Sequence, residues 1–190
     1  MENSNEKFKK YVDWQKEQHS PKQKLSFLVL QEFFHLLVLP TILLLVSELM
    51  NTFFGFNLLK ILPFPLFIYV GGLLLIVFGL FLSLWSRWIQ FKIGQGTPAP
   101  KMPTQKLVIK GPYAYCRNPM ILGDVIWLIG LGGIFNSISL IVLSIIWFTI
   151  HLFYYRFTEE KEMVARFGQE YAEYKNRVPF LIPTFRRKKF

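Results

Sequence analysis

The sequence is poor in charge and in cysteine, and each shortage excludes a class of protein. Only 18% of its 190 residues are Asp, Glu, Lys or Arg, against about 25% in an ordinary soluble domain. The single cysteine, Cys116, excludes a disulfide framework and a cysteine-based zinc site. There is no G-x-G-x-x-G motif and no alternation of strands with helices, which argues against a Rossmann domain. The apolar fraction of 52% in turn excludes a disordered chain.

The apolar residues gather in four blocks whose lengths are close to that of a membrane span. A helix needs about 20 apolar residues to cross a hydrocarbon core of about 30 Å. The blocks cover residues 25–47, 66–85, 120–135 and 138–155. The third block is the shortest, carries Asp124, and ends in a Gly/Asn/Ser cluster that is typical of a tight turn between two spans. The sequence therefore predicts an all-α, integral-membrane helical bundle with about four transmembrane helices.

The basic residues lie almost entirely on one side of this four-span arrangement. Of the 22 Lys and Arg residues, 21 fall in segments 1–24, 86–119 and 156–190, and the remaining one is Lys60. Because basic loops stay in the cytoplasm, both termini and the long loop are predicted to be cytoplasmic. The net charge of +10 is then explained by topology and by attraction to anionic membrane lipids, not by nucleic-acid binding.

Amphipathic segments are predicted at both ends of the membrane domain, which covers residues 25–190. The cytoplasmic segment 1–24 contains apolar residues typical of a short helix on the membrane surface, namely Phe8, Tyr11, Val12 and Trp14. The cytoplasmic tail 156–190 carries apolar residues at three- or four-residue steps, which predict an amphipathic helix that folds back onto the bundle. These residues are Met163, Val164, Phe167, Tyr171, Tyr174 and Val178. Gly168 is expected to bend or divide that helix.

The loop between spans two and three is the first candidate site. It is rich in Gly and Pro between residues 94 and 119, which predicts an ordered irregular path over the surface of the bundle. Asn118 and Pro119 match the N-cap and the first residue of a helix. Two interpretations stay open: a turn that only introduces span three, or a helix start whose N–H groups, with Arg117, hold an anionic ligand.

The segment after span four is the second candidate. Arg156 and Glu160 are four residues apart and face one another on a helix at the membrane boundary. Charges held beside lipid tend to mark a site. The alternative is ordinary helix capping, with Thr158 as N-cap and three acids in the first turn.

Glu32 and His35 in the first span form the third candidate. A carboxylate inside the membrane is by default a candidate functional group, because burying its charge in lipid is costly. Both residues lie close to the cytoplasmic end of the span, however, so the sequence favours pairing of Glu32 with a Lys or Arg of the loop. Asp124 has the same ambiguity, and Cys116 is interpreted as a small buried filler.

Several short motifs, in order and with preserved spacing over residues 94–184, together resemble the bacterial branch of the isoprenylcysteine carboxyl methyltransferase family. The motifs are Gly111-Pro112-Tyr113, Arg117-Asn118-Pro119-Met120, Glu159-Glu160, Phe167-Gly168-Gln169-Glu170-Tyr171, Tyr174, Val178-Pro179 and Ile182-Pro183, with the run Gly-Gln-Gly-Thr-Pro-Ala-Pro at 94–100. The resemblance implies an integral-membrane methyltransferase that uses S-adenosyl-L-methionine, and its bacterial branch implies a location in a bacterial inner membrane. It also implies a lipophilic acceptor, a carboxylate, amine or thiol, methylated at the cytoplasmic membrane face.

The resemblance also implies the residues of the site. The cofactor pocket would be formed by Leu107, Val108, Tyr113, Arg117, Asn118, Pro119 and Met120. Arg156 and either Glu159 or Glu160 match the family's Arg and Glu after the last span, which contact substrate and cofactor. The distance to Gly168 favours Glu159, whereas the Arg-to-Glu spacing of four favours Glu160. Asn118 stands where eukaryotic members have His, so a titrating role at that position is not expected here.

Two other functions remain open at this stage. One is a small four-span transporter that works through Glu32, and the other is a non-catalytic membrane subunit that keeps the fold without a cofactor site. The long tail and the Pro/Gly-rich loop favour the enzyme, because a minimal transporter needs neither. The expected partners are membrane lipids and a lipophilic small-molecule or lipid substrate, while the acceptor and the oligomeric state stay open.

Overall fold

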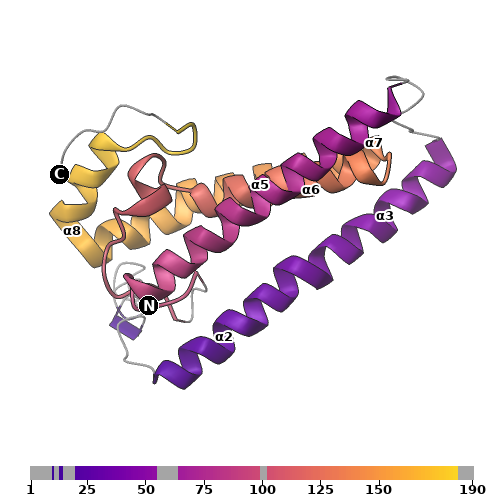
Figure 1. The fold of residues 1–190 in the computed structure, drawn as a ribbon. Helices are drawn as coiled ribbons and strands as arrows, with labels where there is room; N and C mark the ends of the chain where they lie inside the picture. Colours follow the sequence, from indigo (N-terminus) through magenta and orange to yellow (C-terminus); the bar gives the residue numbers. More distant parts are fainter. Residues whose placement is uncertain (1–9, 11–12, 15–19, 55–63, 99–101, 184–190) are drawn as a thin grey trace, which may run out of the picture. The chain divides into compact units, whose positions relative to one another are not determined.

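The computed structural model describes residues 10, 13–14, 20–54, 64–98 and 102–183, most of which are helical (Figure 1). The helices, in chain order, are α2 (Pro21–Phe33), η1 (Phe34–Val38), α3 (Leu39–Phe54), α5 (Pro65–Lys92), η2 (Gly111–Ala114), α6 (Pro119–Ile134), α7 (Ile138–Tyr154), η3 (Tyr155–Glu159) and α8 (Glu160–Arg177). Two of the short elements, η1 and η3, are π-helical turns inside longer helices, and η2 is a 3₁₀ helix.

The predicted all-α membrane architecture is confirmed. Among the described residues, three helices are long and apolar enough to cross a membrane, namely Pro21–Phe54, Pro65–Lys92 and Ile138–Arg177, and the shorter apolar helix α6 matches the third predicted block. The helices run beyond the apolar blocks at several ends, because helical hydrogen bonding continues after the hydrophobic run stops. Of the predicted N-terminal amphipathic residues, Phe8, Tyr11 and Val12 lie outside the described residues.

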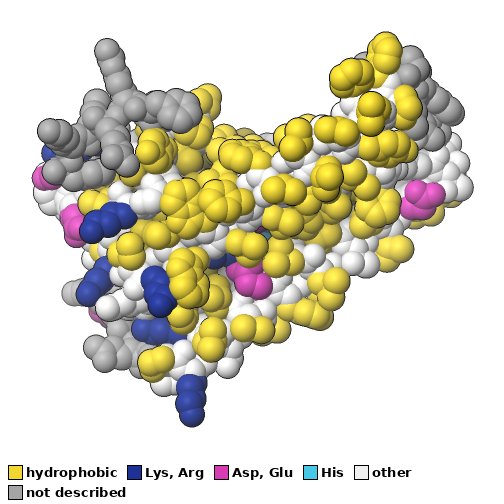
Figure 2. Space-filling view, viewed as in Figure 1, with side chains coloured by type: hydrophobic (Ala, Val, Ile, Leu, Met, Phe, Trp, Pro, Cys, Tyr) yellow, Lys and Arg dark blue, Asp and Glu magenta, His cyan; other side chains and the backbone are white. Residues whose placement is uncertain are grey.

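The chain divides into two compact units, which are described separately. The first unit comprises the described parts of Met1–Glu32, Ser86–Arg117 and Tyr154–Phe190, and the second comprises those of Phe33–Trp85 and Asn118–Phe153. In Figure 2, hydrophobic side chains dominate the visible surface of the second unit, whereas Lys and Arg side chains gather on the first. A domain boundary at residue 24 stays a prediction.

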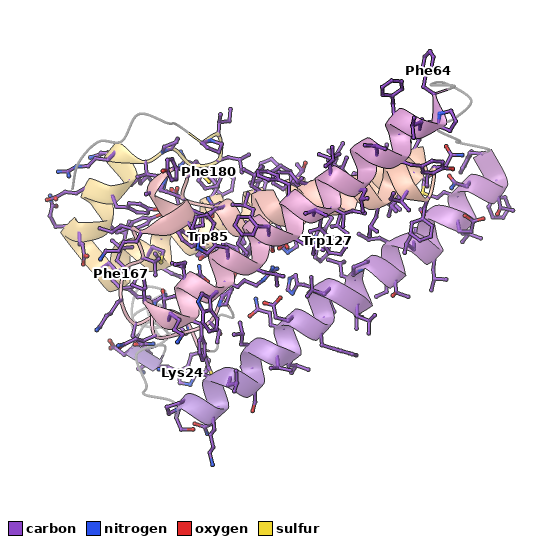
Figure 3. The ribbon with its side chains drawn as sticks, in the orientation of Figure 1. Lys24, Phe64, Trp85, Trp127, Phe167 and Phe180 are labelled. Carbon is purple, nitrogen blue, oxygen red and sulfur yellow. The ribbon has the colours of Figure 1, made fainter. Side chains whose placement is uncertain are left out.

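Helices α5 and α6 of the second unit pack at close range through glycine. A Cβ atom on Gly72 would lie 2.9 Å from the carbonyl oxygen of Gly130, and one on Gly130 would lie 2.6 Å from that of Gly72. Small residues allow this approach of two backbones, which is a common way to join helices in a membrane. Trp127 on α6 is buried with Leu39 and Leu43 of α3, and Figure 3 labels it.

The predicted turn between spans three and four is confirmed. Helix α6 ends at Ile134 and α7 begins at Ile138, with Asn136 at a positive φ of 51°. Asn51 of α3 is tied to this turn, because its Nδ2 donates to Ser137 Oγ over 2.9 Å and its Oδ1 accepts from Ser139 Oγ over 2.8 Å. These bonds satisfy polar groups at the end of an apolar unit, where an unpaired group is costly.

Candidate functional site

A kink in α8 folds the C-terminal segment back toward its own start. Gly168 has φ 53° and ψ −126°, a conformation that suits glycine and strains other residues. Beyond this kink, Lys175 Nζ lies 2.6 Å from Glu160 Oε2. In a straight helix these two residues would be about 22 Å apart along the axis. The predicted bend at Gly168 is confirmed, and it is what brings the two ends of α8 together.

Glu160 is the centre of a cluster of positive charges. Its carboxylate accepts hydrogen bonds from Arg117, from Arg156 at 3.0 Å and from Lys175 at 2.6 Å. The side chains of Glu160 and Arg117 are each 8% exposed, whereas that of Arg156 is 51% exposed. Three cations share one anion, so this group, called here the Glu160 cluster, keeps a net positive charge. A cluster with such a surplus favours a ligand that carries negative charge.

Arg117 joins the loop to the C-terminal segment. Its Nε donates to the carbonyl of Val178 over 3.1 Å, and its backbone N–H donates to the carbonyl of Pro179 over 2.9 Å. The ring of Phe180, labelled in Figure 3, lies 5.4 Å from the guanidinium carbon of Arg117 and 5.7 Å from that of Arg156. Cation–π contacts of this kind hold planar guanidinium groups in one orientation. Arg117 therefore fixes the architecture around Glu160.

An apolar cluster anchors the loop on α8. Leu107 is buried with Tyr171, Tyr174 and Val178, and Ile109, Met163 and Phe167 pack around them. The predicted apolar stripe is thus confirmed except at Val164, which is 46% exposed. The hydroxyl of Tyr174 donates to the carbonyl of Tyr113 over 2.8 Å. The 3₁₀ turn η2 is held against the kinked helix by this bond.

Tyr113 carries a buried hydroxyl that has no hydrogen-bond partner among the described residues. The residue is 5% exposed. Burial, together with the nearby Tyr174 and Glu159, raises the pKa of Tyr113 well above its ordinary value, and the positive charge of Arg87 opposes this rise only in part. The side chain therefore stays a neutral phenol that can donate a hydrogen bond. An unsatisfied buried hydroxyl is a place where a ligand's polar atom would be stabilised.

The first unit contains most of the residues that the sequence singled out, and these are Leu107, Val108, Tyr113, Arg117, Arg156, Glu159 and Glu160. Glu160 is at the centre of the charge cluster, while Glu159 acts electrostatically on Tyr113. Asn118, Pro119 and Met120 belong to the second unit, where Pro119 starts α6 and the carbonyl of Asn118 accepts from Leu122. Asn118 is at the predicted N-cap position, but its side chain makes no capping bond.

The predicted pairing of Glu32 with a basic residue is confirmed, but this residue lies in helix α5 and not in a loop. Arg87 Nε, at the end of α5, lies 3.0 Å from Glu32 Oε1, and the Arg87 side chain is only 2% exposed. Neither Arg87 as the partner of Glu32 nor Lys175 as a member of the Glu160 cluster could be recognised from the sequence pattern. Lys175 gives no periodic signal, because its contact with Glu160 depends on the kink at Gly168. The other ambiguous acid, Asp124, accepts a hydrogen bond from Ser83 Oγ over 2.5 Å within the second unit.

Comparisons with known proteins give consistent matches. The family model described as phospholipid methyltransferase matches residues 67–170, more than half of the chain. The protein-S-isoprenylcysteine O-methyltransferase of Mus musculus is 34% identical over 119 residues, which are 59% of this chain and 40% of the relative. The enzyme of the same name from Homo sapiens is 34% identical over 121 residues, or 60% of this chain and 40% of the relative.

A relative with a different name is the cobalt-zinc-cadmium resistance protein CzcN of Cupriavidus metallidurans, 30% identical over 77 residues, or 40% of this chain and 35% of the relative. The chain therefore spans less than half the length of these curated relatives. No solved structure matches it significantly.

Proposed function

Because this chain belongs to the phospholipid methyltransferase family, we propose that it is an integral-membrane enzyme that transfers a methyl group from S-adenosyl-L-methionine to a lipophilic acceptor at the cytoplasmic face. The resemblance to isoprenylcysteine carboxyl methyltransferases is confirmed by the relatives of that name. The observation that carries the proposal is the Glu160 cluster, which joins the loop and both halves of α8. Such a rigid, cationic region is suited to holding two reactants in a fixed orientation.

The residues of the first unit fit the chemistry of this cofactor. Tyr113 offers a buried phenol hydroxyl that no described residue satisfies, and it can bond a ribose or adenine polar atom. Leu107 and Val108 are buried apolar side chains of the adjoining loop, and such side chains suit the face of a purine. We assign Leu107, Val108, Tyr113 and Arg117 to the cofactor. When bound, S-adenosyl-L-methionine supplies an electrophilic methyl group on a sulfonium sulfur.

Asn118, Pro119 and Met120 follow Arg117 directly in the chain, and their contribution to the same pocket stays a prediction. An Asn side chain both donates and accepts hydrogen bonds without changing charge. The position can therefore orient a ligand, but it cannot move a proton.

The acceptor is assigned to Arg156. This guanidinium is half exposed, is held on one side by Glu160 and lies near the ring of Phe180, so it keeps N–H groups for a ligand. A guanidinium binds a carboxylate or phosphate through paired N–H bonds. Glu160 acts by fixing Arg156 and Arg117, and Glu159 contributes its carboxyl group beside Tyr113. The residues of the chain align the acceptor with the methyl group and exclude water, since methyl transfer is a direct displacement.

The transporter alternative loses its main support, because Glu32 is paired with Arg87. The non-catalytic subunit is separated from the enzyme by two measurements on the detergent-solubilised protein. Calorimetric titration with S-adenosyl-L-methionine should show saturable binding. Incubation with cofactor tritiated in the methyl group should then move label into the organic phase of a membrane extract. A folded, monodisperse protein that neither binds the cofactor nor transfers label would contradict the proposal and favour the subunit.

A further inference from the structure

Arg156 has a single hydrogen-bonding partner in the part of the chain that the structure describes. Its Nη1 donates to Glu160 Oε2 over 3.0 Å, and the side chain is 51% exposed. Arginine has a long side chain with many rotamers, and one partner at its tip leaves it free to rotate. The guanidinium has a second contact, however, because its carbon lies 5.7 Å from the centre of the Phe180 ring.

Phe180 is held in place through the two residues before it. The backbone N–H of Arg117 donates to the carbonyl of Pro179 over 2.9 Å, and Arg117 Nε donates to the carbonyl of Val178 over 3.1 Å. Val178 is also buried in the apolar cluster that anchors the loop on α8. The backbone that carries the Phe180 ring is therefore fixed by hydrogen bonds and by burial, and Figure 3 labels this residue.

The ring of Phe180 contacts two arginines that differ in what they can still bind. The guanidinium of Arg117 lies 5.4 Å from the ring centre. Its side chain is 8% exposed and donates to Glu160 and to the carbonyl of Val178. Arg156 is half exposed and donates to Glu160. Because a guanidinium carries five N–H groups, Arg156 has more of them left for a ligand.

We propose that Phe180 is a positioning residue, which keeps the guanidinium of Arg156 ordered in advance for the carboxylate or phosphate head of the acceptor. The ring supplies a second contact beside the bond to Glu160. Ordering a long side chain during binding lowers the affinity, and a side chain that is already ordered avoids this cost. This role rests on the proposed function, because it uses the assignment of the acceptor to Arg156, but anion binding itself needs no methyl transfer.

The test compares ligands that differ in the charge of the head group. Decanoate and decyl phosphate offer an anion to Arg156, and decanamide is the uncharged reference with the same number of carbon atoms. Their binding to the protein in an uncharged detergent is measured by calorimetry. The ratio of affinities cancels the contribution of the alkyl chain and so reports on the guanidinium. The wild type should bind at least one of the two anions more tightly than decanamide, and Arg156→Leu should abolish this preference.

Phe180→Leu removes the ring and keeps an apolar side chain. It should lower the preference for the anion about two- to tenfold, as expected for ordering one long side chain during binding, while decanamide binds as it does to the wild type. Phe180→Tyr keeps the ring and should keep the preference. Phe157→Leu is the matched control, because it makes the same change at a ring that is 59% exposed in the same unit, and it should leave the preference unchanged.

Four results would overturn the proposal. These are a wild type that prefers neither anion, a preference that survives in Arg156→Leu, a preference that survives in full in Phe180→Leu, and an equal loss of affinity for all three probes in Phe180→Leu. The last result would show a general loosening of the unit and not the positioning of one guanidinium.

Phe180→Met, of similar volume, replaces Phe180→Leu if the latter is not monodisperse in detergent. If neither variant folds, Phe180 is a structural residue and the proposal is wrong. Failure of the proposed function is seen separately, as an absence of S-adenosyl-L-methionine binding by the wild type, because the three decyl probes report on Arg156 without the cofactor.

Discussion

Among the described residues of the first unit, Glu160 and Glu32 both pair with arginine, and they differ in how much positive charge surrounds them. Glu160 is bonded to three cations from the loop, from η3 and from the far end of α8. Glu32 forms an ion pair with Arg87. The first arrangement keeps a positive surplus that can act on a ligand, whereas the charges of the second pair cancel. The net charge of the Glu160 cluster therefore suits an anionic ligand, whereas the pair of Glu32 and Arg87 adds no net charge to its surroundings.

Both carboxylates are close to a π-helical turn. The turn η1 starts two residues after Glu32, and η3 ends immediately before Glu160. π-helical turns inside α-helices are frequent at functional sites. Each adds one residue to a helical turn, which rotates the following side chains by about 100° relative to an unbroken helix. Each turn thus changes which faces of the helix carry the charged side chains.

The largest expected effect is that of Glu160→Gln, which leaves three cations without their anion. Removal of one partner from a buried ion pair costs about 3–5 kcal/mol, and Arg117 is the buried partner here. Thermal unfolding in detergent should therefore show a large loss of stability. The control Glu170→Gln changes an exposed acid on the same helix. If the two variants were equally stable, the Glu160 cluster would not hold the unit together.

Glu32→Gln should have a smaller effect, about 1–3 kcal/mol, because it leaves a single buried partner unsatisfied. The double variant Glu32→Gln, Arg87→Gln should recover part of that loss, since neither charge is then unpaired. No single neutralisation of a cation should rescue Glu160→Gln in the same way. Double-mutant cycles in thermal unfolding measure the coupling free energy between each carboxylate and its cation. Equal coupling free energies at Glu32 and Glu160 would show that the two carboxylates do not differ in this way.

Gly168→Ala tests whether the kink builds the Glu160 cluster. The positive φ of 53° at this residue strains any side chain and should cost about 1–2 kcal/mol. No atom lies within 4 Å of a Cβ built at Gly168, so the effect reports backbone conformation and not a clash. Ala165→Gly, in the same helix before the kink, provides a helix-propensity control. A Gly168→Ala variant as stable as the wild type would show that α8 does not need the kink.

The smallest expected effect is that of Lys175→Met. This side chain is 37% exposed, and such surface ion pairs contribute about 0.2–1 kcal/mol. Lys161→Met, at an exposed lysine of the same helix, should change stability less. The difference in stability between these two variants should become smaller in high salt, because exposed ion pairs are screened. If Lys175→Met lost more stability than Glu160→Gln, the proposed order of contributions to the stability of the Glu160 cluster would be wrong.

Properties that depend on short stretches of the chain could be predicted from the sequence. The apolar lengths indicated the helices, the Gly/Asn/Ser cluster indicated the turn before Ile138, and the position of Glu32 near a basic loop indicated an arginine or lysine partner. The apolar stripe also indicated that Tyr171 and Tyr174 are buried. In each case the signal lies in residues that are neighbours along one helix or at its end.

The arrangement of the candidate site depends on deviations from regular helix and could not be predicted in the same way. Sequence spacing left Glu159 and Glu160 equivalent, because the π-helical turn η3 shifts the face on which each lies. Lys175 was missed, because a regular helix places it far from Glu160. That the Tyr113 hydroxyl has no partner among the described residues was also missed, since pairing is a property of the packed chain.

The most direct test of the central claim is the transfer of tritiated methyl groups from S-adenosyl-L-methionine into a membrane extract by wild-type protein and by Arg156→Leu, with cofactor affinity measured on the same samples. We expect that the wild type labels the extract, and that Arg156→Leu binds cofactor within about threefold of the wild type but transfers no label. Undiminished transfer by the folded Arg156→Leu variant, or loss of its cofactor binding, would contradict the assignment of the acceptor to the Glu160 cluster.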